Sequence, residues 1–410
     1  MKAKVFFIRT LFFFTALPLL FYACAPVYDL RHQDFASAYN PVQSFLFLHA
    51  QVLHTNSDTS FLVLEIPREQ NAITRDTATF LIRYKSFESL SATISTDSAF
   101  IIHGCVSTEK YFHFEIPLLI KSGATGYMKI FVSENFSSKQ TLQIVEFKKQ
   151  GNASGFIFPV RLSDNTKYIL QYADAHTVFR LRNVSGDDTF RVSYFGYKFP
   201  LAVPTFFAQP LINYPEKVDT VFVFTSTDTF SFRKSGLYVF TSSKNPQQHF
   251  SLVCSGNSFP SISEADELAA PLRYISKNEE YDYINHSNVR ARVDSFWIEK
   301  SGDADHAKDM IRRYYNRVQF ANEFFTSYQP GWQTDMGLVF IIFGAPDQVY
   351  YDEDAVWWLY KPRGNRGNIR YKFVRTENPF GAKSFTLVRS PNYFDSWNRQ
   401  GYAWRHGLAD

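Results

Sequence analysis

The sequence has few cysteines and no long apolar segment, and each shortage excludes a class of protein. Only Cys24, Cys105 and Cys254 occur in 410 residues, too few for a disulfide scaffold, and their spacing forms no zinc framework. Cys105 and Cys254 could pair in an oxidising compartment. They lie in what we predict to be different domains, so two buried thiols are the favoured alternative. No segment approaches 18 consecutive apolar residues, so the sequence predicts no membrane-spanning helix.

Familiar catalytic and metal-binding motifs are also missing. The ten histidines are scattered, none forms the helical pair of HExxH, and GxSxG, P-loop and GxGxxG patterns do not occur. The acidic run at 352–354 lacks the alternating ligands of a calcium loop and fits a hairpin turn better. The sequence therefore predicts no catalytic residue, no metal site and no cofactor, and we expect that the protein is not an enzyme.

The N-terminus, by contrast, is typical of exported proteins. Lys2, Lys4 and Arg9 are its only charges, and residues 11–23 are almost wholly apolar. That length suits the apolar part of a signal peptide, whereas a bilayer requires about 20 residues. We therefore predict that residues 1–23 are an export signal.

Residues 21–24 resemble a lipobox, the signal that directs lipid onto a cysteine. They read Phe-Tyr-Ala-Cys, so Cys24 would become the acylated N-terminus of the mature protein. Acyl chains contribute ~0.8 kcal/mol per buried CH₂ to membrane binding. Ala25, where aspartate would indicate the inner membrane, favours the outer membrane, on either its periplasmic or its cell-surface face. The alternative is conventional cleavage near Ala23, which leaves an unmodified thiol.

The composition of the chain is that of globular domains. Apolar residues make up 45% and charged residues 20%, which excludes a disordered tether, and the length after the signal allows two or three domains. Three positive charges of the formal net +4 lie in the signal, so the mature chain is close to neutral. We therefore expect no nucleic-acid partner.

From residue 41 onwards, apolar residues alternate or cluster in short runs typical of β-strands. We expect a polar linker at 24–40, a β-sandwich-like domain at 41–150 and a second at 151–260. In the second domain, strands 178–184 and 189–195 are predicted to form a hairpin. The other expected strands are 45–52, 60–66, 79–84, 111–119, 127–132, 142–147, 219–225, 237–241 and 249–254.

The composition changes abruptly after residue 260. All six tryptophans follow residue 296, and helical patterns first appear at 287–300 and 304–326. Asn322 interrupts the apolar stripe of the second helix, and Asp303 or Asp305 is expected to cap it. We therefore predict a third domain at 262–410, with helices followed by a small antiparallel sheet. The expected fold class is mainly β with an α+β C-terminal domain.

The segment 330–347 carries a family resemblance. It contains Gly-Trp-Gln-Thr-Asp at 331–335 and Gly-Ala-Pro-Asp at 344–347, and the preceding helix ends with Asn-Glu-Phe-Phe at 322–325. In this order the segments resemble the GWxTD-domain family of lipoproteins and envelope proteins typical of Bacteroidetes, over roughly residues 265–410. The resemblance implies the same architecture, a lipid signal followed by a β-rich middle and a motif domain. It implies no established reaction.

The motif residues also have a structural interpretation. A buried strand is expected at 338–343 between two turns, with Trp332 anchoring the first turn in the core. Such a strand would hold Asp335 and Asp347 about 20 Å apart, too far for a catalytic pair, so both are expected to stabilise turns. The residues that we single out as structural or binding residues are Gly331, Trp332, Thr334, Asp335, Gly344, Pro346 and Asp347.

A basic segment follows the motif. Ten Lys and Arg residues against three acids occur from Lys361 to the end of the chain. We predict a candidate binding patch at Arg363, Arg366, Arg370 and Lys372, suited to an anionic glycan, lipid head groups or an acidic partner. The alternative is a charged, solvated face.

Three functions remain open. The leading hypothesis is a non-catalytic interaction or scaffold component of an outer-membrane assembly, held to the membrane by its lipid and bound to other envelope proteins. The second is glycan binding, which requires several of Trp357, Trp358, Trp397 and Trp404 to be exposed and roughly coplanar. The third is an unrecognised hydrolase, which requires close acids or a Ser/His pair in a cleft.

Overall fold

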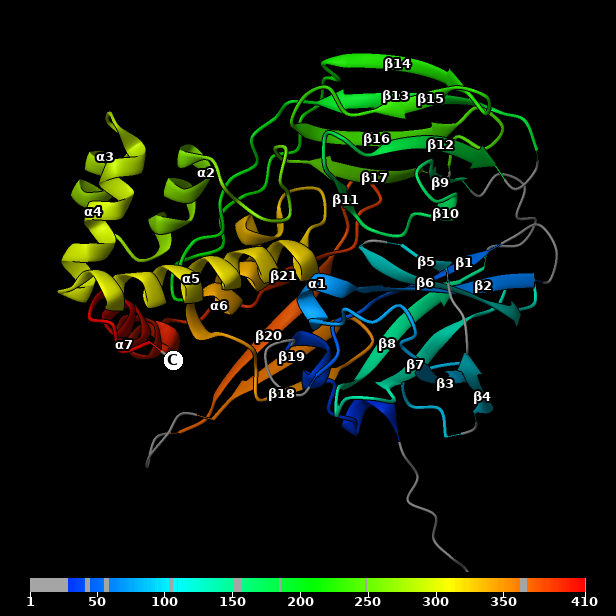
Figure 1. Ribbon diagram of the computed structural model, residues 1–410, viewed down its shortest axis with the longest axis horizontal. Coiled ribbons are helices and arrows are strands. Elements are labelled where there is room, and N and C mark those ends of the chain that lie inside the picture. Colours follow the sequence, from blue (N-terminus) through cyan, green and yellow to red (C-terminus); the bar gives the residue numbers. More distant parts are fainter. Residues whose placement is uncertain are drawn as a thin grey trace, which may run out of the picture.

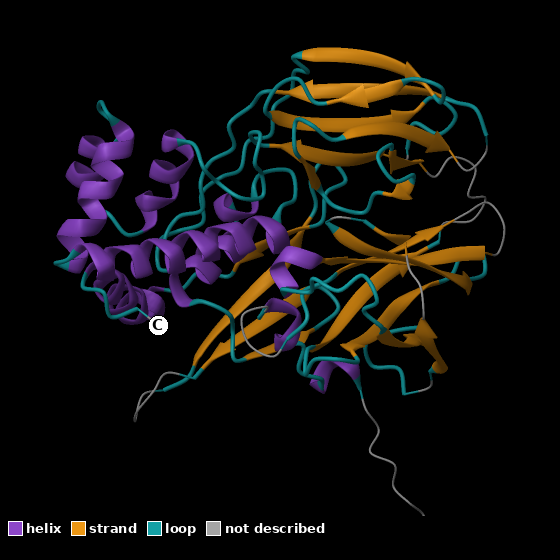
Figure 2. Ribbon diagram, in the orientation of Figure 1, coloured by secondary structure: helices purple, strands orange, loops and turns teal. Residues whose placement is uncertain are grey.

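Two β-sandwiches and a helix-covered sheet make up the computed structural model (Figure 1). The structure describes residues 29–40, 45–54, 59–93, 95–102, 106–108, 110–149, 157–183, 186–247, 249–361 and 367–409. Cys24 and Cys105 therefore lie outside the described residues. Figure 2 shows the helices gathered at one side of the molecule and the sandwiches at the other, which confirms the expected fold class.

The first sandwich contains all six strands predicted for it. One sheet has the order β1-β2-β6-β5 and the other β4-β3-β7-β8, and alternate residues of β7 are buried along its whole length. Apolar side chains from both sheets form one core. The strands are β1 (His49–His54), β2 (Thr59–Pro67), β3 (Phe80–Phe87), β4 (Thr96–Ile102), β5 (Val106–Ser107), β6 (Tyr111–Leu119), β7 (Thr125–Glu134) and β8 (Gln140–Lys148), with the short α1 (Arg68–Asn71) after β2.

The second sandwich lies over the first in Figure 1. Its sheets have the orders β10-β9-β12-β15 and β11-β17-β16-β13-β14. The strands are β9 (Ile157–Arg161), β10 (Thr166–Lys167), β11 (Tyr172–Ala173), β12 (Val178–Asn183), β13 (Thr189–Phe195), β14 (Thr220–Thr225), β15 (Thr229–Ser231), β16 (Gly236–Ser242) and β17 (His249–Cys254).

The predicted hairpin in this sandwich is wrong. Strands β12 and β13 do not pair with each other. β12 pairs with β9 and β15, whereas β13 pairs with β14 and β16. Their inward side chains, such as Phe179 and Phe190, meet in one core from opposite sheets. A turn between two half-buried strands has the same local pattern whether the chain stays in one sheet or crosses to the other.

The third unit packs helices against a four-stranded antiparallel sheet of order β18-β19-β20-β21. As expected, the Asp303 carboxylate caps the long helix α5 and accepts hydrogen bonds from the backbone N–H groups of Asp305 and His306. The elements are α2 (Ala265–Ala269), α3 (Asn278–Ile284), α4 (Val289–Ser301), α5 (Ala304–Phe325), α6 (Asp335–Phe343), β18 (Gln348–Tyr351), β19 (Ala355–Tyr360), β20 (Ile369–Thr376), β21 (Ser384–Leu387) and α7 (Phe394–Arg405). No described helix is long and apolar enough to cross a membrane.

The strand expected at 338–343 is instead part of helix α6. Every residue from Asp335 to Ile342 is buried. A segment that is apolar on all sides shows neither the two-residue period of a half-buried strand nor the 3.6-residue period of an amphipathic helix. The one local feature that indicates a helix here and not a strand is Thr334, whose side chain caps the helix N-terminus.

Residues 29–40 are packed, although they fall in the segment 24–40 that was expected to form a linker. Leu30 and Phe35 are buried in the core of the third unit. The Phe35 backbone N–H donates to Val349 O of β18, and the Leu30 N–H donates to Leu90 O of the first sandwich. The two short 3₁₀ turns of this segment, η1 (Leu30–His32) and η2 (Ala36–Tyr39), therefore join the first and third units.

Cys254 is a buried free thiol. Burial, together with the nearby Asp174 carboxylate, raises the pKa of this thiol to about 11, so it stays protonated near neutral pH. Its expected state as a buried thiol is confirmed.

Candidate functional site at the junction of the three units

Two polar residues at the end of α5, one in its last turn and one just after it, hold the beginning of the motif. Asn322 is fully buried, its Oδ1 accepts the Trp332 backbone N–H at 3.1 Å, and its Nδ2 donates to Pro260 O at 2.9 Å. The Thr326 hydroxyl donates to Asn322 O at 2.6 Å and accepts the Gly331 N–H at 3.0 Å. Asn322, which interrupts the apolar stripe of the sequence, is therefore the side chain that fixes the motif to α5.

Two glycines allow backbone to pack directly on backbone. A Cβ on Gly331 would lie 1.9 Å from Ala321 O, and one on Gly337 would lie 1.9 Å from Gly331 O. Neither glycine has a positive φ. Both positions therefore require glycine for space, not for an unusual backbone conformation.

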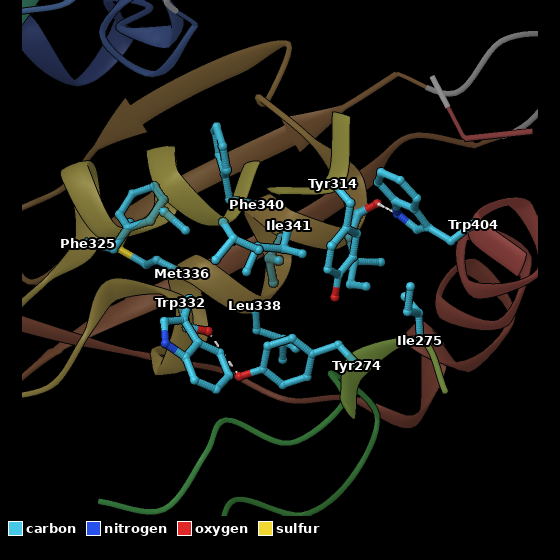
Figure 3. Packing of buried hydrophobic residues seen from close by; sticks show 14 of the residues in the cluster. Tyr274, Ile275, Tyr314, Phe325, Trp332, Met336, Leu338, Phe340, Ile341 and Trp404 are labelled. Atoms are coloured by element: carbon cyan, nitrogen blue, oxygen red, sulfur yellow. Dashed lines mark hydrogen bonds between the residues drawn. The ribbon is translucent and has the colours of Figure 1, made fainter. Parts of the chain in front are cut away.

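The Trp332 side chain lies in the core, as predicted. The hydrogen bonds described for this residue are formed by its backbone N–H and carbonyl groups. Its carbonyl accepts the Tyr274 hydroxyl at 3.0 Å, the dashed line beside both rings in Figure 3. The Thr334 hydroxyl then donates to Gly331 O at 2.7 Å and accepts the Gly337 N–H at 3.1 Å, which caps α6. Thr334, not Asp335, is thus the capping residue.

Asp335 forms a buried ion pair that the sequence did not reveal. Its carboxylate accepts Arg389 Nη1 at 2.9 Å and Nη2 at 2.5 Å, and it also accepts the Leu387 backbone N–H at 2.8 Å. Arg389 Nη2 donates further to Val203 O at 3.1 Å, and the side chains of both ions are less than 10% exposed. Because Ala202 N–H donates to Gln333 O, the motif joins α6, β21 and the segment at 199–212.

The second motif segment is a turn, as expected. Gly344 has a φ of 83°, and its carbonyl accepts the Tyr360 hydroxyl at 2.9 Å. Pro346 is buried, and the exposed Asp347 accepts the Lys361 N–H at 2.7 Å. Asp335 and Asp347 bind different partners and do not form a pair. The 20 Å estimate for their separation assumed a strand and does not apply to a helix, which rises only ~1.5 Å per residue.

Beside the motif lies a cavity of about 490 Å³, lined by residues of all three units. Known small-molecule sites span roughly 300–1,000 Å³. Within the cavity wall, Tyr172 of β11 donates its hydroxyl to Glu323 Oε2, and His49 Nε2 of β1 lies 3.3 Å from the same oxygen. Burial and the Glu323 carboxylate raise the pKa of Tyr172 well above its ordinary value, so its hydroxyl remains a donor.

A second buried charge cluster lies between the two sandwiches. Glu65 of β2 is fully buried and accepts Arg161 Nη2 of β9 at 2.5 Å. His113 of β6 places its two ring nitrogens 3.3 Å from Glu65 and 3.1 Å from Glu115. Lys167 of β10 in turn contacts Glu115. Two ion pairs, Glu65–Arg161 and Glu115–Lys167, therefore connect the sandwiches. The His113 ring lies between the two carboxylates of these pairs.

His113 is expected to make the stability of this interface depend on pH. Burial by itself lowers its pKa, but the hydrogen bonds to Glu115 and Glu65 outweigh burial and raise the pKa above 6.5. The stabilisation is therefore complete below pH 6.5 and is lost as the pH rises through the folded-state pKa. The urea midpoint of the native protein should fall between pH 5.5 and pH 8.0. In the His113→Gln variant this fall should be smaller, because the titrating imidazole is gone.

The matched control is His286→Gln, because His286 is exposed. It should keep the native difference between the two midpoints. An equal pH response in native protein and His113→Gln would contradict a role for protonated His113.

The structure describes only part of the predicted basic patch. Arg363 and Arg366 lie outside the described residues. Arg370 is exposed, and Lys372 Nζ lies 4.9 Å from the centroid of the Trp357 ring. Farther along, Arg375 pairs with Glu146, Arg389 with Asp335, and Arg405 with Glu280. Among the basic residues of this segment that the structure describes, intramolecular ion pairs thus engage these three.

The tryptophans do not form the platform that the glycan hypothesis required. Trp358, Trp397 and Trp404 are at most 7% exposed, and only Trp357 of the four is partly exposed. A Ser/His pair does occur, with His54 Nδ1 3.0 Å from Ser60 Oγ, but Ser60 is fully buried. Among the described residues, no three His, Cys, Asp or Glu side chains cluster as metal ligands do.

Sequence reasoning found the motif but missed most of its partners. The family resemblance included Asn322 and Glu323 without giving them a role. Arg389, Tyr172 and His49 carried no signal, because each is distant in sequence from the group that it contacts.

The comparisons with known proteins agree with the motif. Residues 236–406 match the family model of the GWxTD domain, and the match begins at the first residue of β16, within the second sandwich. No curated protein matches. Among solved structures, a red sea bream transglutaminase is similar over 51% of this chain and 31% of its own length, with 7% identity and a TM-score of 0.16. This chain thus spans under a third of that protein, and a likeness of this strength carries no argument.

Proposed function

The chain contains a GWxTD domain, and from that premise we propose that it is a lipid-anchored envelope protein that docks another protein at the edge of its second sandwich. The proposed role is non-catalytic: the sandwiches present a binding edge, and the GWxTD domain holds them in a fixed arrangement. The observation that carries the proposal is the character of the edge strand β14.

Strand β14 is an unprotected edge. It pairs with β13 on one side, and no described strand pairs with its other side, as Figure 1 shows at the top of the molecule. Its residues Thr220–Thr225 include no charge and no proline, the features that usually block strand addition at an edge. Val221 and Val223 are 42% and 67% exposed on its outer face. Such an edge suits an extended, uncharged segment of a partner protein, added as a further strand.

The position of the proposed anchor supports this use of β14. Cys24 precedes Asp29 by five residues, which span at most about 18 Å. Residues 29–40 are packed between the first and third units, at the bottom of Figure 1, whereas β14 lies at the top. A lipid on Cys24 would thus hold the lower end near the bilayer and leave β14 pointing away from it.

The docking proposal is tested by charge on the edge strand. The double variant Val221→Lys, Val223→Lys should lower recovery of the partner at least tenfold when the lipidated protein is purified from membranes and its companions are quantified by mass spectrometry. Because both side chains are exposed, the unfolding midpoint should hardly change.

The control is Ile298→Lys, at a residue of α4 that is 49% exposed. It should keep the partner. Recovery of the chain alone, or of the same companions with the edge variant and with the control, would contradict docking at β14.

The anchor is tested separately. Cys24→Ala should move the protein from the membrane fraction to the soluble fraction, because the acylated residue is lost. A variant that remains in the membrane fraction after a high-salt wash would show that the anchor is not the lipid on Cys24.

A further inference from the structure

We propose that the outer face of the sheet β18–β21 lies against the anionic surface of a lipid bilayer. The inference rests on the envelope location proposed above and is independent of docking at β14. It adds a second membrane contact to the lipid on Cys24 and identifies the side of the chain that faces the membrane.

The two faces of this sheet differ. Trp358 and Tyr371, opposite each other on β19 and β20, are fully buried in the core of the third unit. Adjacent residues of a strand point to opposite faces, so Tyr350, Trp357 and Lys372 lie together on the other face. These three are directly opposite one another on β18, β19 and β20, and each is partly exposed. They form a row of two amphipathic aromatic side chains and one cation across the sheet.

Trp357 differs from the other tryptophans of the chain, which are at most 8% exposed. Its ring packs against no other described aromatic ring, and Lys372 Nζ lies 4.9 Å from its centroid. An accessible indole combines an apolar ring with an N–H donor. Such a side chain suits the interface between lipid and water, where tryptophan and tyrosine are enriched.

Basic and apolar groups extend this row. Arg370 is exposed on the same face, two residues before Lys372, and neither cation forms an ion pair with the described residues. Val388, which is 45% exposed, lies beside Lys372 because its N–H donates to Lys372 O. The face thus offers cations to lipid head groups, and an indole and a valine to the apolar region just below them.

Carboxylates lie away from the two cations. The acidic turn between β18 and β19 is at the far end of the sheet, where the Arg375 N–H donates to Asp354 O. Arg375 is five residues from Arg370, about 16 Å along a strand. Asp347, at the near end, precedes β18, which is two strands and roughly 10 Å from β20. Asp395 belongs to α7, which packs on the buried face of the sheet. This arrangement of charge fits an anionic bilayer.

The position of the proposed anchor supports a membrane at this face. The Phe35 N–H donates to Val349 O, so the segment 29–40 contacts β18, and Figure 1 shows both in the lower part of the molecule. Cys24 precedes Asp29 by five residues, which span at most about 18 Å. A lipid on Cys24 would therefore bring the sheet to the same bilayer.

The test is vesicle binding by the chain from residue 24 onwards, with Cys24→Ala so that no lipid is attached. It should bind vesicles of phosphatidylcholine with roughly 30% phosphatidylglycerol at least tenfold more tightly than vesicles of phosphatidylcholine alone. The double variant Arg370→Gln, Lys372→Gln should bind the anionic vesicles at least tenfold more weakly. Because the other tryptophans are buried, a shift of the emission to shorter wavelengths on binding reports Trp357, and Trp357→Phe should remove the shift.

The matched control is Arg191→Gln, Lys244→Gln, which removes two exposed charges from the second sandwich. It should bind anionic vesicles as the unsubstituted chain does, and both double variants should keep a thermal midpoint close to the native value. Equal binding by the two double variants, no preference for anionic vesicles, or an unchanged emission on binding would overturn the proposal. Failure of the anchor would be seen separately, because the vesicle test uses a chain without lipid and the fractionation of Cys24→Ala tests the lipid.

Discussion

Gly331→Ala is expected to destabilise the C-terminal unit by at least ~3 kcal/mol. The new methyl would lie 1.9 Å from Ala321 O, 2.7 Å from Ala321 C and 2.8 Å from the Asn322 Cα, all backbone atoms of α5. No side chain can rotate away to make room, so α5 and the motif must separate and weaken the bonds of Asn322 and Thr326 to the motif. Tryptophan fluorescence during denaturation measures the effect selectively, because all six tryptophans follow residue 296.

Gly401→Ala is the matched control. Gly401 lies within α7, and a Cβ there meets nothing within 4 Å. Alanine in a helix interior is favoured over glycine by about 1 kcal/mol, so this variant should be as stable as the native chain or slightly more stable. Equal midpoints for Gly331→Ala and Gly401→Ala would contradict the close backbone packing.

Arg389→Met is expected to cost about 3–5 kcal/mol, because it leaves the Asp335 carboxylate buried without its cation. The guanidinium makes two bonds to Asp335 and another to Val203 O, and methionine replaces none of them. The lower stability should appear in the unfolding transition detected by tryptophan fluorescence. Adding Asp335→Asn to the same chain should recover part of the stability, because the amide removes the unpaired charge.

Arg312→Met provides the comparison. Arg312 pairs with Asp309 on the surface of α5, where the two side chains are 74% and 56% exposed. Exposed pairs of this kind contribute about 0–1 kcal/mol. If Arg389→Met cost no more than Arg312→Met, the Asp335–Arg389 pair would not stabilise the junction.

The sequence predicted secondary structure best for elements that have one buried face and one solvent-exposed face. The strands of the first sandwich and helix α5 were found because apolar side chains recur with the period of each element. Helix α6 was taken for a strand because it is buried on every side and shows no period. The crossing between β12 and β13 was taken for a hairpin because sheet membership is set by long-range pairing.

The site was harder to predict than the fold, because its contacts link distant parts of the chain. Asp335 and Arg389 are 54 residues apart, and Tyr172 and Glu323 are 151 apart. The motif itself marks only one side of each contact. The packing of Leu30 and Phe35 was equally hard to predict, because it also depends on contacts with distant parts of the chain. Their segment reads as polar, yet these two apolar side chains make it part of the core.

Hydrogen–deuterium exchange of Arg389→Met tests most directly whether the GWxTD motif is the joint between α6, β21 and the segment at 199–212. If it is, the variant should exchange faster than the native chain at Leu387, whose amide donates to Asp335, and at Ala202, whose amide donates to Gln333. Strand β7 of the first sandwich should keep its native protection. Unchanged exchange at both Leu387 and Ala202 would contradict a structural joint at the motif.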